Sequence, residues 1–160
     1  MNTSISPNTL DTLKIEVTSI LSKDNLTITD RLTMVCELLE KHISYYNWVG
    51  FYFKNGDKPE LKLRAYAGEE TDHTIIPFGK GICGQVAVSN ENFVVPDVKA
   101  QDNYIACSIN VKAEIVIPLF LNGENIGQID IDSHTPDPFT EADTKFLEWV
   151  NAEVAKILES

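Results

Sequence analysis

Three segments of the chain place apolar residues at the 3.6-residue spacing of an amphipathic helix. They cover residues 10–21, 29–41 and 139–158. In the last segment, Thr140 is followed by Asp143 three residues later, which predicts a capping box at the helix start. We therefore expect two helices at the beginning of the chain and one at its end.

Between these segments the pattern changes to short stretches rich in β-branched and aromatic residues, as is typical of strands. Strands are predicted at residues 47–53, 61–66, 93–95, 114–120 and 126–133. Asn122-Gly123-Glu124-Asn125 forms a hairpin signal between the last two, and residues 82–89 could form a short helix. The pattern predicts an α+β fold in which the terminal helices pack on one face of an antiparallel sheet. No linker interrupts it, so we expect a single domain over residues 1–160.

Strand alternation separates two faces of the predicted sheet. The apolar face of residues 47–53 and 126–133 should pack against the helices. The opposite face carries aromatic and acidic side chains: Trp48, Tyr52, Asp130 and Asp132. This face could be an ordinary solvent-exposed surface. It could also be the floor of a pocket roofed by residues 68–112, a long segment with little predicted regular structure.

Charge and cysteine content narrow the function classes. The chain has 13 basic and 24 acidic residues in 160 and a formal charge of −11, which disfavours binding to nucleic acid or to an anionic membrane surface. No apolar run approaches the roughly 20 residues of a membrane span, and a signal peptide is not expected. Three cysteines are too few for a disulfide scaffold, so we expect a reducing cytoplasmic location.

Six short motifs are distributed between residues 47 and 147. They read Asn47-Trp48-Val49-Gly50-Phe51-Tyr52, Gly79-Lys80-Gly81-Ile82-Cys83-Gly84, Val95-Pro96-Asp97-Val98, Ile105-Ala106-Cys107, Glu114-Ile115-Val116, and Ile126-Gly127 through Asp130-Ile131-Asp132-Ser133. In order and spacing they resemble the motifs of the GAF-domain free methionine-(R)-sulfoxide reductases. The resemblance implies the GAF fold, with a central antiparallel sheet, terminal helices and a capping segment over a pocket.

The resemblance also implies roles for two cysteines. Cys107 would attack the sulfoxide and become a sulfenic acid, and Cys83 would then form a disulfide with it, which a thioredoxin-type reductant would reduce. No cofactor is implied. Where the family often has a further cysteine, this chain has His73. The alternative is that Cys83 and Cys107 are two small buried apolar residues, which is the role we expect for Cys36.

Glu114, Asp130 and Asp132 match the carboxylate cluster of the same family. Three nearby carboxylates repel one another, so at least one should have a raised pKa. Charged members could hold the ammonium of a free amino acid, and a protonated member could act as a general acid. Trp48 and Tyr52 would form the pocket wall around the thioether, unless they are simply packing aromatics. A metal site is not expected, because no His or Cys lies at a diagnostic ligand spacing.

Two function classes follow. The first is a reductase of free methionine-(R)-sulfoxide. The second is a non-catalytic GAF sensor or binding module for an amino-acid-like small molecule, since a fold alone does not define a function. A disulfide between Cys83 and Cys107 that forms on addition of the substrate would distinguish them. A homodimer is compatible with both.

Overall fold

The computed structural model describes residues 5–101 and 110–159 of the chain. Its helices are α1 (Pro7–Leu21), α2 (Ile28–His42), α3 (Gly81–Ser89), the 3-10 helix η1 (Val98–Ala100) and α4 (Glu141–Leu158). Its strands are β1 (Trp48–Lys54), β2 (Glu60–Ala67), β3 (Ile75–Pro77), β4 (Phe93–Val95), β5 (Ala113–Leu121) and β6 (Glu124–Ser133). Across these residues, no helix combines the length and apolar character that a membrane crossing needs.

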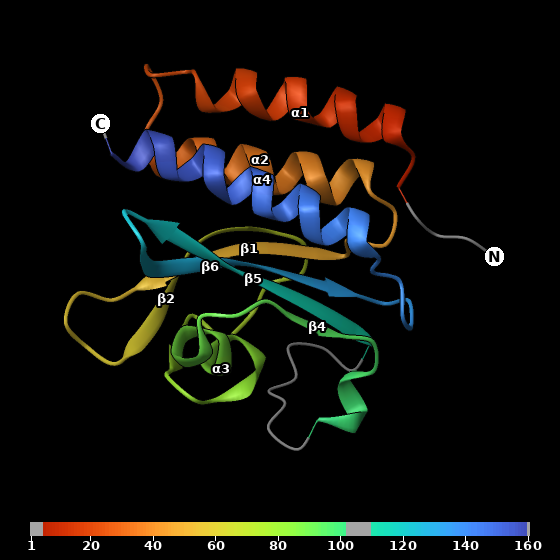
Figure 1. Ribbon diagram of the computed structural model, residues 1–160, viewed down its shortest axis with the longest axis vertical. Coiled ribbons are helices and arrows are strands. Elements are labelled where there is room, and N and C mark those ends of the chain that lie inside the picture. Colours follow the sequence, from red (N-terminus) through yellow and green to blue (C-terminus); the bar gives the residue numbers. More distant parts are fainter. Residues whose placement is uncertain (1–4, 102–109, 160) are drawn as a thin grey trace.

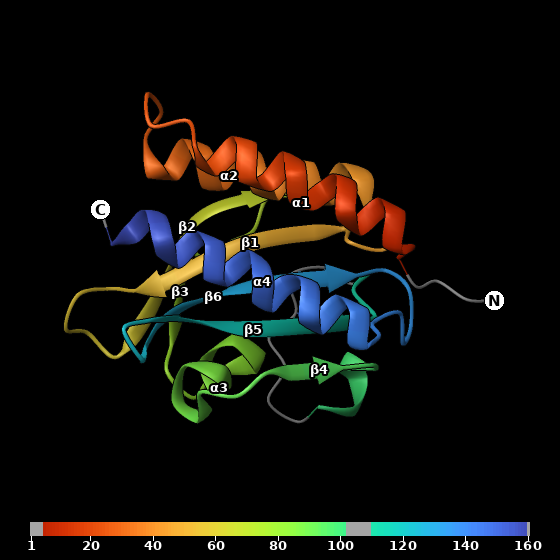
Figure 2. The same cartoon turned by 45° about the horizontal axis from the view of Figure 1, so that its top comes forward.

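The six strands form one antiparallel sheet in the order β3-β2-β1-β6-β5-β4. Helices α2 and α4 lie against one face of this sheet with α1 packed on them as an outer layer, and α3 lies on the other face (Figure 1). The turned view in Figure 2 shows the same layers, with α3 and β4 on the side away from the three long helices. The predicted α+β class and the position of the terminal helices are confirmed.

Helix boundaries follow from local capping. Ser6 Oγ accepts a hydrogen bond from the Thr9 amide at 3.2 Å, and Thr27 Oγ1 accepts one from the Asp30 amide at 3.0 Å. These bonds satisfy amide groups that have no partner inside the first turn of a helix. The predicted capping box of α4 is present at Thr140.

The turn between β5 and β6 is shorter than predicted, because it contains only Asn122 and Gly123 and not the four residues 122–125. Asn122 and Gly123 both have positive φ, 53° and 82°, as a two-residue type I′ turn demands. Both strands therefore extend beyond their predicted limits and meet at Leu121 and Glu124. This turn sets the register of the two strands that carry the acidic residues.

The apolar face predicted from alternation is confirmed. Val49, Phe51, Ile129 and Ile131 are fully buried with residues of the three long helices. A second apolar cluster on the opposite face joins the sheet to α3. The sequence did not predict β3 or η1, because each has only three residues and neither shows a period that could be recognised.

One buried carboxylate connects the start of α4 to the segment before β1. Asp143 is inaccessible to solvent, and its Oδ1 accepts hydrogen bonds from the Tyr45 and Tyr46 hydroxyls at 2.8 and 2.7 Å. Its Oδ2 accepts a bond from the Thr140 amide at 2.8 Å. Asp143 therefore both completes the capping box of α4 and holds the segment that leads into β1.

Candidate active site

Strand register brings the acidic residues together on the face of the sheet away from the long helices. Asp132 on β6 pairs with Trp48 on β1 on one side and with Glu114 on β5 on the other. Asp130, two residues earlier, pairs with Gly50 and Val116. Because side chains alternate along a strand, Asp130 and Asp132 project from the same face.

This face is not open to solvent. Asp130 and Asp132 are each 2% exposed, and Trp48 and Tyr52 are also buried. The covering comes from α3 and from the segment between β2 and α3. Trp48 Nε1 donates a hydrogen bond to the Glu69 carbonyl at 3.0 Å, and the Tyr52 hydroxyl donates one to the His73 carbonyl at 2.8 Å. The two aromatic residues thus attach the covering segment to the sheet.

Gly50 makes room for the Trp48 ring. The indole lies across Gly50, and a Cβ at this position would overlap with the ring atoms. The ring also stacks on Tyr66, with centroids 5.7 Å apart and an interplanar angle of 16°. Because Gly50 pairs with Asp130, the absence of its side chain determines how the indole lies beside the carboxylates. The motif that contains Gly50 gave no sign of this role, because the contact between the indole and Gly50 depends on the side-chain position of Trp48.

Cys83 reaches the carboxylates from α3. Its Sγ lies 3.9 Å from Glu114 Oε2, a distance that suits a weak S–H···O hydrogen bond. The Cys83 Sγ and one oxygen each of Glu114 and Asp130 all lie within 4.8 Å of one another. Together with Tyr52 and His73, these residues line a narrow cavity of about 20 Å³. A sequence separation of 31 residues between Cys83 and Glu114 concealed this proximity.

Burial dominates the ionisation of this cluster. Burial raises the pKa of the Cys83 thiol, and the charges of Asp130 and Glu114 raise it further. The first turn of a helix normally favours a thiolate, but here desolvation outweighs that effect. Burial also raises the pKa of Asp130, although hydrogen bonds with Glu114 and Cys83 act in the opposite direction. The sequence predicts a raised carboxyl pKa from mutual repulsion, whereas for Asp130 the cause of the raised pKa is burial.

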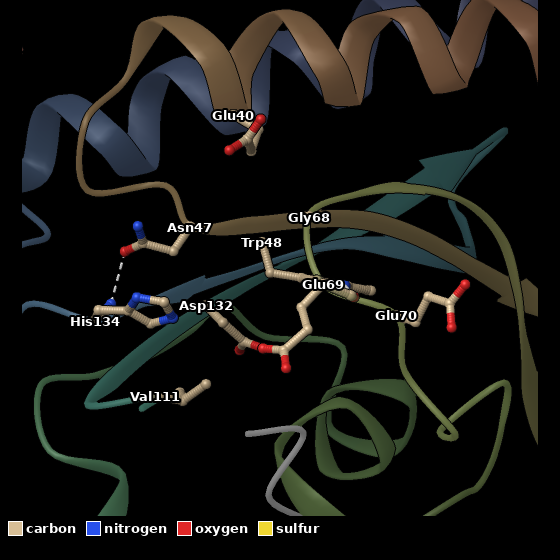
Figure 3. Close-up of a pocket in the computed structure, with 9 residues that line it drawn as sticks. All are labelled: Glu40, Asn47, Trp48, Gly68, Glu69, Glu70, Val111, Asp132 and His134. Atoms are coloured by element: carbon tan, nitrogen blue, oxygen red, sulfur yellow. Dashed lines mark hydrogen bonds between the residues drawn. The ribbon is translucent and has the colours of Figure 1, made fainter. Parts of the chain in front are cut away.

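A wider cavity of about 260 Å³ adjoins the other end of the acidic row. Figure 3 shows its lining residues around the ends of β1 and β6, with Asn47 and His134 on one side and Glu70 on the other. Trp48 and Asp132 contribute to its wall. Glu40, Glu69 and Glu70 add to its negative charge, and no motif in the sequence indicated these three residues.

Gln128 continues the polar row on β6 beyond Asp130. Its side chain is fully buried, and neither its amide nitrogen nor its carbonyl oxygen has a hydrogen-bond partner in the part of the chain that the structure describes. The period of two along the strand places Gln128 on the same face as Asp130 and Asp132. A buried amide with no partner is costly, so Gln128 is a polar group that can serve a ligand or a bound water.

The structure divides the predicted site residues between two cavities. Cys83, Glu114, Asp130 and Tyr52 line the narrow cavity, whereas Trp48 and Asp132 line the wide one. Cys107 lies outside the described residues, so its role and its pairing with Cys83 stay predictions. Cys36 is buried in α2 within the core on the other face of the sheet, where burial raises its thiol pKa.

These features define a class: an α+β domain in which an antiparallel sheet carries helices on one face and a covered polar site on the other. The chain belongs to the GAF domain family, whose sequence pattern matches residues 25–159.

Named relatives of two kinds are similar to this chain. GAF domain-containing protein A of Dictyostelium discoideum is 33% identical over 145 residues, which cover 91% of this chain and 87% of that protein. The free methionine-R-sulfoxide reductase of Escherichia coli (strain K12) is 35% identical over 121 residues, 76% of this chain and 72% of that protein. The X-ray structure of free methionine-R-sulfoxide reductase from Neisseria meningitidis in complex with its substrate superposes with a TM-score of 0.88, at 32% identity over 98% of this chain and 93% of that one.

Proposed function

We propose that this chain reduces free methionine-(R)-sulfoxide to methionine with its own thiols. The observation that carries the proposal is the position of Cys83 in a small buried cavity, with its Sγ 3.9 Å from Glu114 Oε2 and beside Asp130. A binding module has no need of a thiol among carboxylates. Similarity to named reductases over most of the chain supports the same conclusion.

The proposed reaction has two chemical steps. Cys107 attacks the sulfoxide sulfur while a carboxylic acid protonates the oxygen, and the oxygen ends on Cys107 as a sulfenic acid when methionine leaves. The Cys83 thiol then attacks the Cys107 sulfur, water leaves, and a disulfide remains. A dithiol of the thioredoxin type returns both cysteines to thiols and is itself oxidised to a disulfide.

The carboxylates divide into two roles in this proposal. Asp130 is the proton donor, because burial raises its pKa and so favours its protonated form. Asp132 holds the substrate ammonium, because it lines the wider cavity together with Trp48 and lies among further acidic residues. The Trp48 indole supplies an apolar surface for the methylene groups and the thioether.

Turnover of each methionine sulfoxide epimer with a thioredoxin system tests the activity. We expect reduction of the R epimer only, and no reduction by Cys107→Ser, whose hydroxyl does not ionise near neutral pH. Intact mass after one addition of substrate should show the loss of two hydrogens, with a peptide linking Cys83 to Cys107. The Cys36→Ser variant is the matched control and should behave like the wild type. Binding of the sulfoxide without any oxidation would identify a GAF binding module instead.

Preference for the free amino acid tests the role of Asp132. A buried carboxylate loses its counter-charge when the substrate carries an amide in place of the ammonium. A charge-assisted hydrogen bond is worth roughly 1.5–3 kcal/mol, so N-acetylation should lower kcat/KM by at least about tenfold. Asp132→Asn should reduce kcat/KM for the free substrate and narrow this preference. Equal rates of wild type on both substrates would exclude an ammonium site.

The need for a reductant places the proposed reaction in a reducing compartment such as the cytoplasm, where a thioredoxin-type dithiol is available. The acidic lining of the wider cavity suits a substrate that brings an ammonium and disfavours anionic partners such as nucleic acid.

A further inference from the structure

We propose that Cys83, Glu114 and Asp130 form a binding site for a divalent transition-metal ion, with Zn²⁺ as its best fit, and that the bound ion blocks the site. The proposed metal binding is inferred only from the positions of these side chains and the cavity that they line. Its inhibitory effect rests on the function proposed above.

The first support is the distance between the donor atoms. The Cys83 sulfur and one oxygen from each carboxylate lie within 4.8 Å of one another. In a tetrahedral zinc site with bonds of about 2.0–2.3 Å, neighbouring ligand atoms are roughly 3.3–3.8 Å apart. The Cys83 to Glu114 distance of 3.9 Å already approaches this value. Small side-chain rotations on α3, β5 and β6 would close the remaining gap.

The second support is a buried carboxylate oxygen of Asp130 that accepts no hydrogen bond from the described residues. Asp130 Oδ1 is buried and has no hydrogen-bond partner among residues 5–101 and 110–159, and Asp130 forms no ion pair there. Its side chain is 2% exposed and lines the narrow cavity. The cavity volume of about 20 Å³ is close to that of a single water-sized occupant. A cation in it would provide the positive charge that this oxygen lacks.

The donor set selects the metal. One thiolate and two carboxylates suit Zn²⁺ or Co²⁺, whereas Mg²⁺ and Ca²⁺ prefer oxygen ligands alone. A water molecule would take the fourth position of a tetrahedral ion. Lys80 also lines this cavity, but its side chain is exposed, so solvent screens its repulsion of a cation. This proposal departs from the expectation of no metal site, because the three ligands come from distant parts of the chain and so show no ligand spacing in the sequence.

Metal binding would remove two groups from the proposed reaction at once. A metal-bound Cys83 sulfur cannot attack a sulfenic acid, and a metal-bound Asp130 cannot deliver a proton. A chelator should therefore restore activity in full. Reversible inhibition of this kind differs from oxidation of the thiols, which only a reductant would reverse.

Cobalt(II) titration of the full, reduced and metal-free chain tests the site directly. We expect a thiolate-to-cobalt charge-transfer band that saturates at one equivalent and disappears when Zn²⁺ is added. Cys83→Ser should abolish the band, whereas Cys36→Ser and Cys107→Ser should keep it. A band that survives in Cys83→Ser, disappears in Cys107→Ser, or never forms in the wild type would overturn the proposal.

A second measurement covers the case in which a variant does not fold. In the wild-type chain, one equivalent of Zn²⁺ should slow alkylation of Cys83 at least about tenfold, as read by peptide mass spectrometry, while Mg²⁺ should have no effect. Equal protection by Mg²⁺, or none by Zn²⁺, would count against a thiolate-containing site. The two proposals fail separately: a chain that binds Co²⁺ through Cys83 but reduces no sulfoxide loses its proposed function and keeps its metal site.

Discussion

Asp130→Asn should make the Cys83 thiol more reactive. The change removes a charge but keeps the shape of the side chain, so access to Cys83 should stay the same. After burial, the charge of Asp130 is the largest cause of the raised Cys83 pKa, followed by that of Glu114, with Asp132 last. Removing the Asp130 charge therefore lowers the pKa of Cys83 and increases the fraction of thiolate, which is the nucleophile in alkylation.

The distance between the two groups sets the magnitude. Two unit charges at the 4.8 Å limit of this cluster interact by about 3.5 kcal/mol at an effective dielectric constant near 20. That is a factor of several hundred in thiolate population when Asp130 is fully ionised. Because burial also raises the pKa of Asp130 and so disfavours its charged form, this factor is an upper limit for the effect. We therefore expect Cys83 alkylation to accelerate by at least about tenfold.

Iodoacetamide labelling at pH 7.5, followed by peptide mass spectrometry, reports each cysteine separately. Cys36 serves as an internal control, because it lies in the core on the other face of the sheet. Glu114→Gln should accelerate Cys83 labelling less than Asp130→Asn, and Asp132→Asn least. A Cys83 rate within twofold of wild type in Asp130→Asn, or an equal acceleration at Cys36, would refute this electrostatic account.

Three further predictions concern stability and packing. Asp143→Asn should lower the free energy of unfolding, measured by urea denaturation, by about 2–4 kcal/mol. The reason is that an amide cannot accept all the hydrogen bonds that the buried carboxylate accepts. A loss under about 0.5 kcal/mol would contradict this account. Gly50→Ala should displace the Trp48 ring and weaken sulfoxide binding, visible as changed tryptophan fluorescence in a Trp149→Phe background; unchanged emission would show that the ring tolerates a Cβ. Asp130→Asn should raise Tm more at pH 8 than at pH 5. The pKa of the buried Asp130 carboxyl is raised in the folded state, so this carboxyl destabilises the fold increasingly as the pH rises. An equal gain in Tm at both pH values would contradict a raised pKa.

Much of the fold was predictable because its signals are local. The predicted capping box at Thr140 and the hairpin turn that begins at Asn122 each depend on residues within four positions of one another. Strand alternation assigned the two sheet faces for the same reason, since the backbone fixes a period of two wherever a strand forms. The three residues of β3 carry too few positions for a period, and β3 appeared only in the structure, whereas the equally short β4 was predicted from its aromatic and β-branched residues.

The candidate site was predictable in its residue types but not in its arrangement. Asp130 and Asp132 share a strand, so their common face followed from the sequence. The approach of Cys83 to Asp130 depends on how α3 packs over the sheet, and no local rule gives that contact.

The sequence by itself determined the helices, the main strands, the apolar and polar faces of the sheet and the candidate chemistry, because each of these follows from neighbouring residues. Only the tertiary structure decided that the polar face is buried, that Gly50 leaves space for the Trp48 ring, and that Cys83 joins Asp130 in one cavity. Burial is a property of what packs against a residue, and a raised pKa follows from burial. The physical properties of the site therefore come from contacts between distant segments, which the sequence pattern does not encode locally.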